Sequence, residues 1–289
     1  MKRLVLGLIC SILALSCITP TVYAEPPKNK GLAITPLREY STVAAGHTKN
    51  AALTIANNTD KPVTVSLTVE QFSVADYTYE YHFAPARDDW IKFESPQIKL
   101  PPYTSQKVAY TLAPPKNAVP GGHYFSLFAT STVGDGAITS YAKVGTVLYV
   151  TVAGNVQYKS YIEQTSAPWI SFGGDIPITF VIHSASNSHF FAYGFEDLHG
   201  IGTNSHTNDP AHIILPGTIR KLQVSHPSPL LPGVYQVEYG YKTDTGQTIT
   251  KNNQLIYLPI WFVAIVAGAV WLVALLGRKT IGFWRRQRT

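Results

Sequence analysis

The stretch Val63-Thr64-Val65-Ser66-Leu67-Thr68-Val69 sets the fold class of this chain. Apolar and polar side chains alternate at every position, and successive side chains of a strand point to opposite faces. A strand here places the three valines and Leu67 against a core and the hydroxyl side chains on the outer face. The turn-forming run at 57–62, Asn-Asn-Thr-Asp-Lys-Pro, joins it to a preceding β-rich segment.

Outward from this stretch, short β-rich runs alternate with Gly, Pro, Asn and Asp, which is typical of β-sandwiches. No segment between residues 31 and 250 shows a sustained helical period. The sequence therefore predicts an all-β exterior region. The predicted strands of its first half are 33–36, 49–56, 63–72, 77–83, 97–100, 105–112, 122–131 and 144–153.

The chain also repeats itself. A strand that ends in Leu-Pro occurs twice, as does a Pro-Gly corner before an aromatic strand, and a third, looser pair lies upstream of both. The three pairs, in chain order, are 53–58 with 178–183, 98–101 with 213–216, and 119–124 with 231–235. Three similarities in one order predict two tandem immunoglobulin-like β-sandwich domains, at 31–153 and 154–252.

An uncharged apolar run at 256–276 follows the second predicted domain. About 20 such residues are enough to cross a bilayer as a helix, and this run has no polar stripe for a soluble surface. The tail at 277–289 carries five Lys and Arg and no acid. The positive-inside rule then predicts a single-pass membrane protein with an extracellular N-terminal region and a cytoplasmic C-terminus.

The amino end is typical of a secretory signal peptide at 1–24, with Lys2 and Arg3 before an apolar run and Val-Tyr-Ala at its end. A lipoprotein signal ending at Cys17 is the alternative. Both cysteines, Cys10 and Cys17, lie inside the signal, so the mature chain has no disulfide and no cysteine ligand.

The net charge of +6 reflects this predicted topology. Seven of the 23 Lys and Arg residues lie in the signal and the tail, which leaves 16 against 17 Asp and Glu elsewhere. The exterior region is therefore nearly neutral. It has no basic cluster with interleaved aromatics, and nucleic acid is excluded as a partner.

Catalytic motifs are absent from the sequence: it contains no His-Glu-x-x-His, no Gly-x-Ser-x-Gly and no phosphate-binding glycine loop. Asp88 and Asp89 are paired carboxylates of the kind a glycosidase needs, but neighbouring residues of an extended chain point in opposite directions. We therefore predict no catalytic residue, no cofactor and no enzyme activity.

Histidines are concentrated in the second predicted domain, at 183, 189, 199, 206, 212 and 226. Convergent imidazoles can bind zinc, copper or nickel. Their spacing matches no metal signature, so the prediction is exposed loop histidines and no metal site.

Tyr77, Tyr79 and Tyr81 alternate with polar residues, and Trp90 follows nearby. On one strand face these tyrosines would either line the core or form an aromatic platform for a glycan or a partner protein. We take Tyr77, Tyr79, Tyr81 and Trp90 as the candidate ligand or partner surface.

The layout of signal, two sandwiches, apolar helix and basic tail resembles the Gram-positive cell-surface family with paired DUF916 and DUF3324 domains, the WxL-interacting proteins. The residues that carry the likeness are Ala33–Pro36, Ala45–His47, Asn57–Pro62, Leu100-Pro101 and Pro120–Gly122. The resemblance covers residues 31–153 and implies binding to peptidoglycan and to surface-layer partners. It matches no individual binding residue.

Taken together, the sequence predicts a membrane-anchored, non-catalytic cell-surface protein that binds cell-wall peptidoglycan or glycan, a surface-layer protein, or both. An exported chaperone or assembly factor, which lends a strand edge to a client, is the first alternative. A glycan-active enzyme is the second.

Overall fold

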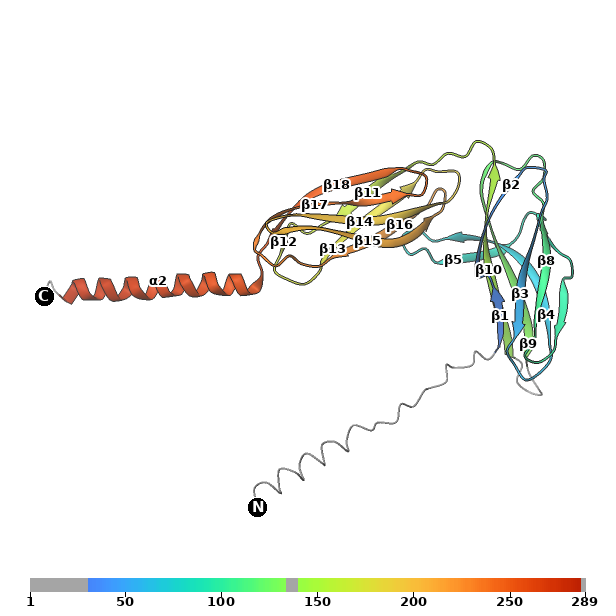
Figure 1. The fold of residues 1–289 in the computed structure, drawn as a ribbon, viewed down its shortest axis with the longest axis horizontal. Helices are drawn as coiled ribbons and strands as arrows, with labels where there is room; N and C mark the ends of the chain where they lie inside the picture. Colours follow the sequence, from blue (N-terminus) through green and yellow to red (C-terminus); the bar gives the residue numbers. More distant parts are fainter. Residues whose placement is uncertain (1–30, 134–139, 287–289) are drawn as a thin grey trace, which may run out of the picture.

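The structure is a computed structural model that describes residues 31–133 and 140–286, with side chains described for 31–131 and 141–276. Most of these residues lie in strands, which confirms the all-β prediction, and Figure 1 shows two β units in sequence followed by a helix. The predicted signal peptide at 1–24 lies outside the described residues.

The first unit contains the strands β1 to β10. Their bounds are β1 (Leu32–Thr35), β2 (Arg38–Ala44), β3 (Lys49–Asn57), β4 (Val63–Val74), β5 (Tyr81–Pro85), β6 (Ile91–Phe93), β7 (Gln97–Leu100), β8 (Ser105–Leu112), β9 (Gly121–Val133) and β10 (Ser140–Ala153). One sheet has the order β1-β3-β8-β6 and the other β2-β10-β9-β4-β5, with β7 paired to β4. We call this unit the first sandwich.

The alternation that sets the fold class is borne out in β4. Val63, Val65 and Leu67 are buried and the intervening hydroxyl residues are exposed. They join one core between the two sheets, to which the opposite sheet contributes residues such as Leu53 and Ile55. Burying a large apolar side chain contributes roughly 1.5–3 kcal/mol, so this core dominates the stability of the first sandwich.

The first strand changes sheets. β1 pairs antiparallel with β3, the bond between Thr35 and Pro36 is cis, and β2 then pairs parallel with β10 in the other sheet. Pro36 has no N–H to donate, so it sits where a ladder must be interrupted. The switch places a strand beside β10 from residue 147 onward.

The second unit, which we call the second sandwich, contains β11 to β18. Their bounds are β11 (Ser160–Ser166), β12 (Ile170–Ser171), β13 (Ile176–Ser184), β14 (Phe190–Gly200), β15 (Thr203–Ile214), β16 (Ile219–His226), β17 (Gly233–Thr243) and β18 (Thr248–Tyr257). Its sheets, β11-β13-β16 and β12-β18-β17-β14-β15, enclose a separate core that includes Phe180 and Tyr241. β12 runs parallel to β18 as β2 does to β10.

The repeated sequence segments fall at matching places in the two sandwiches. The segments at 98–101 and 213–216 end β7 and β15, which pair with β4 and β14. The Pro-Gly corners at 120–121 and 232–233 begin β9 and β17. The looser pair lies in β3 and β13, which pair with β8 and β16.

The helix α2 (Ile260–Arg286) follows β18 and extends away from the second sandwich (Figure 1). Across the described part of the chain, no helix combines the length and apolar character that a bilayer crossing requires. The predicted membrane-spanning helix at 256–276 is corrected by this finding. The prediction of a cytoplasmic tail at 277–289 depended on that helix and is corrected with it.

Candidate functional site: the junction and the open edge of β10

The predicted strand at 77–83 begins later than expected. β5 starts at Tyr81, and residues 75–80 form a turn closed by the bond from the N–H of Ala75 to the carbonyl of Glu80, 2.9 Å. Tyr77 and Tyr79 have positive φ values of 65° and 60°, which are uncommon for residues other than glycine. The three tyrosines therefore do not share one strand face.

This turn docks on the second sandwich. The N–H of Tyr77 donates to the carbonyl of Ile219 at 2.7 Å, and the N–H of Ile219 donates to Asp76 Oδ1 at 2.8 Å. Tyr77 also forms an isolated β-bridge with Arg220. One backbone–backbone bond and one bond from a backbone N–H to a side-chain carboxylate hold residues about 140 positions apart, so the left-handed backbone is stabilised by tertiary structure rather than by the local sequence.

Tyr79 is the anchor of the turn. Its hydroxyl accepts from the N–H of Leu215 at 2.8 Å and donates to Thr218 Oγ1 at 2.6 Å, and Thr218 in turn donates to the carbonyl of Leu215. The guanidinium of Arg220 lies over the ring of Tyr79, 4.2 Å from its centroid. Burial raises the pKa of the Tyr79 hydroxyl, so it stays a neutral donor.

A loop of the second sandwich docks in return on the first. The N–H of Gly122 donates to the carbonyl of Asn187 at 2.7 Å, and the hydroxyls of Thr151 and Ser188 are 3.2 Å apart. A Cβ on the preceding residue, Gly121, would lie 2.3 Å from the carbonyl oxygen of Asn187, so a residue without a side chain permits the close approach.

His189 is enclosed by aromatic rings of the first sandwich. Its ring centroid lies 5.4 Å from that of Tyr149, 5.7 Å from that of Tyr124 and 6.0 Å from that of Tyr40. Burial lowers the pKa of His189 to about 4, because the charged imidazolium loses its hydration there. At neutral pH an uncharged imidazole fills this cage.

Tyr81 completes the aromatic part of the contact. Its hydroxyl lies 2.9 Å from that of Tyr149, and its ring packs edge to face on Phe72. Tyr149 is fully buried, and burial, followed by the bond to Tyr81, raises its pKa. We call the contact formed by residues 75–81, 187–191 and 213–220 with the rings around Tyr149 the junction.

Trp90 lies elsewhere. It is 6% exposed in the first core, with its ring 4.4 Å from His123 and 5.7 Å from Phe125 by centroid. Of the four residues predicted as a surface, Tyr77, Tyr79 and Tyr81 lie in the junction and Trp90 is separate. No pattern in the sequence predicted the partners of Tyr79 in the second sandwich, and His189 was singled out only as a metal candidate.

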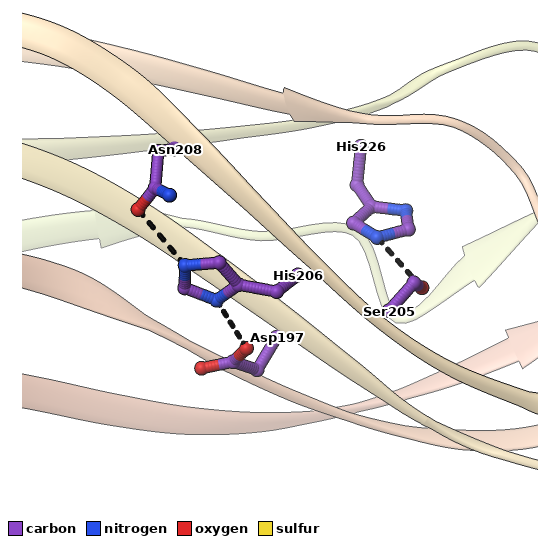
Figure 2. Close-up of polar contacts among 5 residues, drawn as sticks. All are labelled: Asp197, Ser205, His206, Asn208 and His226. Carbon is purple, nitrogen blue, oxygen red and sulfur yellow. Dashed lines mark hydrogen bonds and ion pairs between the residues drawn. The ribbon is translucent and has the colours of Figure 1, made fainter.

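Five of the six histidines of the second sandwich have side-chain partners within the fold, at 183, 189, 206, 212 and 226. Figure 2 shows His206 between Asp197 and Asn208, at 2.5 Å and 2.9 Å. His212 lies 2.6 Å from Asp209. Among the described residues, no three His, Cys, Asp or Glu side chains converge in a way that could hold a metal ion. Asp88 and Asp89 likewise contact different residues, Gln71 and Lys92.

The amino-terminal half of β10 has a hydrogen-bonded strand on one side only. β9 pairs with β10 along its length, whereas β2 pairs with residues 147–153 alone. The N–H of Val147 points to β2, since it donates to the carbonyl of Leu37 at 3.1 Å. Backbone groups alternate in direction along a strand, so those of Tyr141, Lys143 and Gly145 face away from β9. In the described part of the chain, no backbone hydrogen bond occupies this edge.

Comparisons with known proteins give likeness of fold at low identity. No protein-family model matches this chain, and no curated protein sequence matches it. A class 5 fimbriae chaperone, CfaA, is similar over 77% of this chain and 99% of its own, with 8% identity and a TM-score of 0.46. A chain of the CsuC–CsuE chaperone–tip adhesion subunit pre-assembly complex of Acinetobacter baumannii is similar over 78% of this chain and 99% of its own, with 10% identity and a TM-score of 0.40. The Escherichia coli chaperone DraB is similar over 78% of this chain and 95% of its own, with 14% identity and a TM-score of 0.36.

The prediction of a membrane-anchored surface protein that binds cell-wall glycan or peptidoglycan is corrected by these findings. The similar structures are chaperones, and the described residues contain no helix able to span a bilayer. The predicted single-pass localisation, the glycan partner and the membrane partner are corrected with it. Membership of the DUF916/DUF3324 family stays a prediction.

Proposed function

We propose that this protein is an exported chaperone or assembly factor that lends the open edge of β10 to an incomplete β-domain of a client. In this proposal the chain consists of two tandem immunoglobulin-like domains, at 31–153 and 154–252, and the signal peptide at 1–24 directs its export. The observation that carries the proposal is the edge at 141–146, where three residues turn their backbone groups away from β9.

Strand addition uses main-chain hydrogen bonds for affinity, so an unpaired edge is its first requirement. Three other outer strands carry features that discourage pairing. β5 ends at Pro85, and β15 contains Pro210. β12 has two residues. Proteins block edges with proline and short strands, and residues 141–146 have neither.

The side chains at this edge suit a client strand. Tyr141 is exposed, and the ammonium of Lys143 is held over the sheet face by Glu70 Oε1 at 2.7 Å and by the ring of Phe128 at 3.8 Å. The charge is therefore drawn over neighbouring strands rather than left free beside the edge. The proposed activity is binding, and none of its steps makes or breaks a covalent bond.

A pair of variants at one position tests the proposal. Lys143→Pro removes an N–H that faces the open edge while leaving the β9 ladder intact, because the N–H of Lys143 points away from β9. Lys143→Ala removes the same side chain and keeps the N–H. The probe is an immunoglobulin-like domain from which the last strand has been deleted, mixed with the full chain and followed by gel filtration and by amide exchange at 141–146.

The natural protein and Lys143→Ala should form a complex with the probe and gain amide protection at 141–146. Lys143→Pro should lose at least tenfold in affinity. Equal binding by the two variants would show that the edge is not used, and failure of the natural protein to bind would refute the chaperone proposal. Thermal unfolding of both variants checks that the first sandwich is intact.

A further inference from the structure

Ser205 and His226 form a hydrogen-bonded pair in the second sandwich, outside the junction and away from the edge of β10. Ser205 Oγ lies 2.9 Å from His226 Nε2, and Figure 2 marks this contact with a dashed line. The pair joins β15 of one sheet to β16 of the other. A nucleophile within hydrogen-bonding reach of a base is the first geometric requirement for nucleophilic catalysis.

A third group orients the histidine. His226 Nδ1 lies 2.6 Å from the carbonyl oxygen of Pro227. A carbonyl can only accept, so in the neutral ring Nδ1 carries the proton and Nε2 presents its lone pair. The serine hydroxyl therefore donates to Nε2, which is the direction that general-base activation requires.

Ladder hydrogen bonds hold both residues in place. Ser205 is in register with Leu198 of β14, and His226 is in register with Ile176 of β13. His226 is 4% exposed, so its ring has little room to turn away from Ser205. A pair carried by two rigid strands keeps the reacting atoms aligned without a conformational change.

A cavity of about 280 Å³ opens beside the pair. Its lining includes Ser205, His226, Thr203, Ser228 and Leu230, together with His206. No Asp, Glu, Lys or Arg is among the lining residues, which favours an uncharged ligand over an ionic one. His206 has both ring nitrogens engaged by Asp197 and Asn208, so it does not compete as the base for Ser205.

We propose that Ser205 is a nucleophile, activated by His226, that takes an acyl group from small uncharged esters bound in this cavity. Ser205 Oγ bonds to the carbonyl carbon as its proton passes to His226 Nε2. The bond from that carbon to the alkoxy oxygen breaks, and the leaving alcohol takes the proton from His226. Water then attacks the acyl-serine and gives a proton to His226. The bond from the acyl carbon to Ser205 Oγ breaks, Oγ takes that proton from His226, and the carboxylic acid is released.

A fluorophosphonate probe on the full chain tests this pairing directly. Attack by Ser205 breaks the P–F bond, releases fluoride and leaves a phosphonyl group on Oγ that peptide mass spectrometry locates. Ser228 is the matched control, because it lines the same cavity and the hydrogen bonds of the described residues give it no histidine partner. His226→Asn retains a side-chain N–H for the Pro227 carbonyl but removes the base.

The natural protein should be labelled at Ser205 and not at Ser228, and Ser205→Ala should not be labelled. His226→Asn should slow labelling at least about 100-fold, the lower end of what a general base contributes. The proposal is overturned if Ser205 in the natural protein is not labelled, or is labelled no faster than Ser228. It is also overturned if His226→Asn reacts at the natural rate, with thermal unfolding confirming that the variant is folded.

Discussion

The hydroxyl of Tyr79, in the first sandwich, lies 2.6 Å from the hydroxyl of Thr218, in the second. The same tyrosine oxygen accepts the N–H of Leu215, so one side chain satisfies two groups across the junction. The two sandwiches are therefore joined by specific polar contacts as well as by apolar packing around Tyr149. The relative placement of the edge of β10 and the second sandwich depends on these contacts.

Replacing Tyr79 by Phe tests the anchor. The change leaves the N–H of Leu215 without its acceptor and removes the hydrogen bond that Thr218 Oγ1 accepts. An unsatisfied buried group costs about 1–3 kcal/mol when it is poorly hydrated. We expect urea unfolding at a lower midpoint and faster amide exchange at 213–220. Tyr103→Phe, at a site 71% exposed, is the control and should change neither. If amide exchange at 213–220 in Tyr79→Phe is as slow as in the natural protein, the role assigned to Tyr79 is contradicted.

Acid should weaken the junction through His189. Burial lowers the pKa of this histidine from 6.5 to about 4, so its contribution is fully present above pH 6.5 and is lost as the pH falls towards 4. The groups around it are the rings of Tyr40, Tyr124 and Tyr149, and the Asp244 carboxylate partly opposes the shift. The natural protein should lose up to about 3 kcal/mol of unfolding free energy by this route.

His189→Phe isolates the effect, because it keeps a ring in the cage and removes the titrating group. As the pH falls from 6.5 to 4, the urea midpoint of the natural protein should decrease relative to that of the variant. A difference that stays constant with pH would mean that His189 does not report on the junction.

Glu196 should destabilise the second sandwich in a pH-dependent way. Its side chain is fully buried on β14, both carboxyl oxygens have no hydrogen-bond partner among the described residues, and burial raises its pKa to about 8. A raised carboxyl pKa means that the cost of folding appears above pH 4.5 and grows until about pH 8.

Glu196→Gln should therefore raise the unfolding free energy by up to about 3 kcal/mol at pH 7 and by little at pH 4.5. Glu238→Gln, on β17 of the same sheet, is the control and should give no comparable gain. Thermal unfolding at the two pH values measures both. A stabilisation that is equal at pH 4.5 and pH 7 would argue against a titrating Glu196.

Gly121→Ala should wedge the sandwiches apart. A Cβ at Gly121 would lie 2.3 Å from the carbonyl oxygen of Asn187, and its φ of +129° is already strained for a residue with a side chain. Gly217→Ala is the control, because its φ is +66° and a Cβ there meets nothing within 4 Å. Overpacking typically costs about 1–3 kcal/mol, so the first variant should be less stable than the second by that amount. Equal midpoints would contradict the close approach.

The alternation in 63–69 was sufficient to predict which side chains of β4 enter the core, because a strand's period of two is a local property. The repeated Leu-Pro and Pro-Gly segments also fell on matching strands, since a sandwich needs the same turn chemistry at the same place. The predicted strand at 77–83 failed in its first half. There, bonds from Asp76 and Tyr79 to residues 215–220 outweigh the strand propensity of the tyrosines.

The sequence by itself determined the all-β class and the side chains of β4 that enter the core, because these follow from side-chain period and turn residues along a short segment. Only the tertiary structure decided that Tyr79 meets Thr218, that Trp90 is buried beside Phe125, and that the start of β10 has an unpaired edge. Each of these depends on which distant segments pair with one another. Such pairing leaves no pattern in any single stretch, because it is set by the packing of whole sheets.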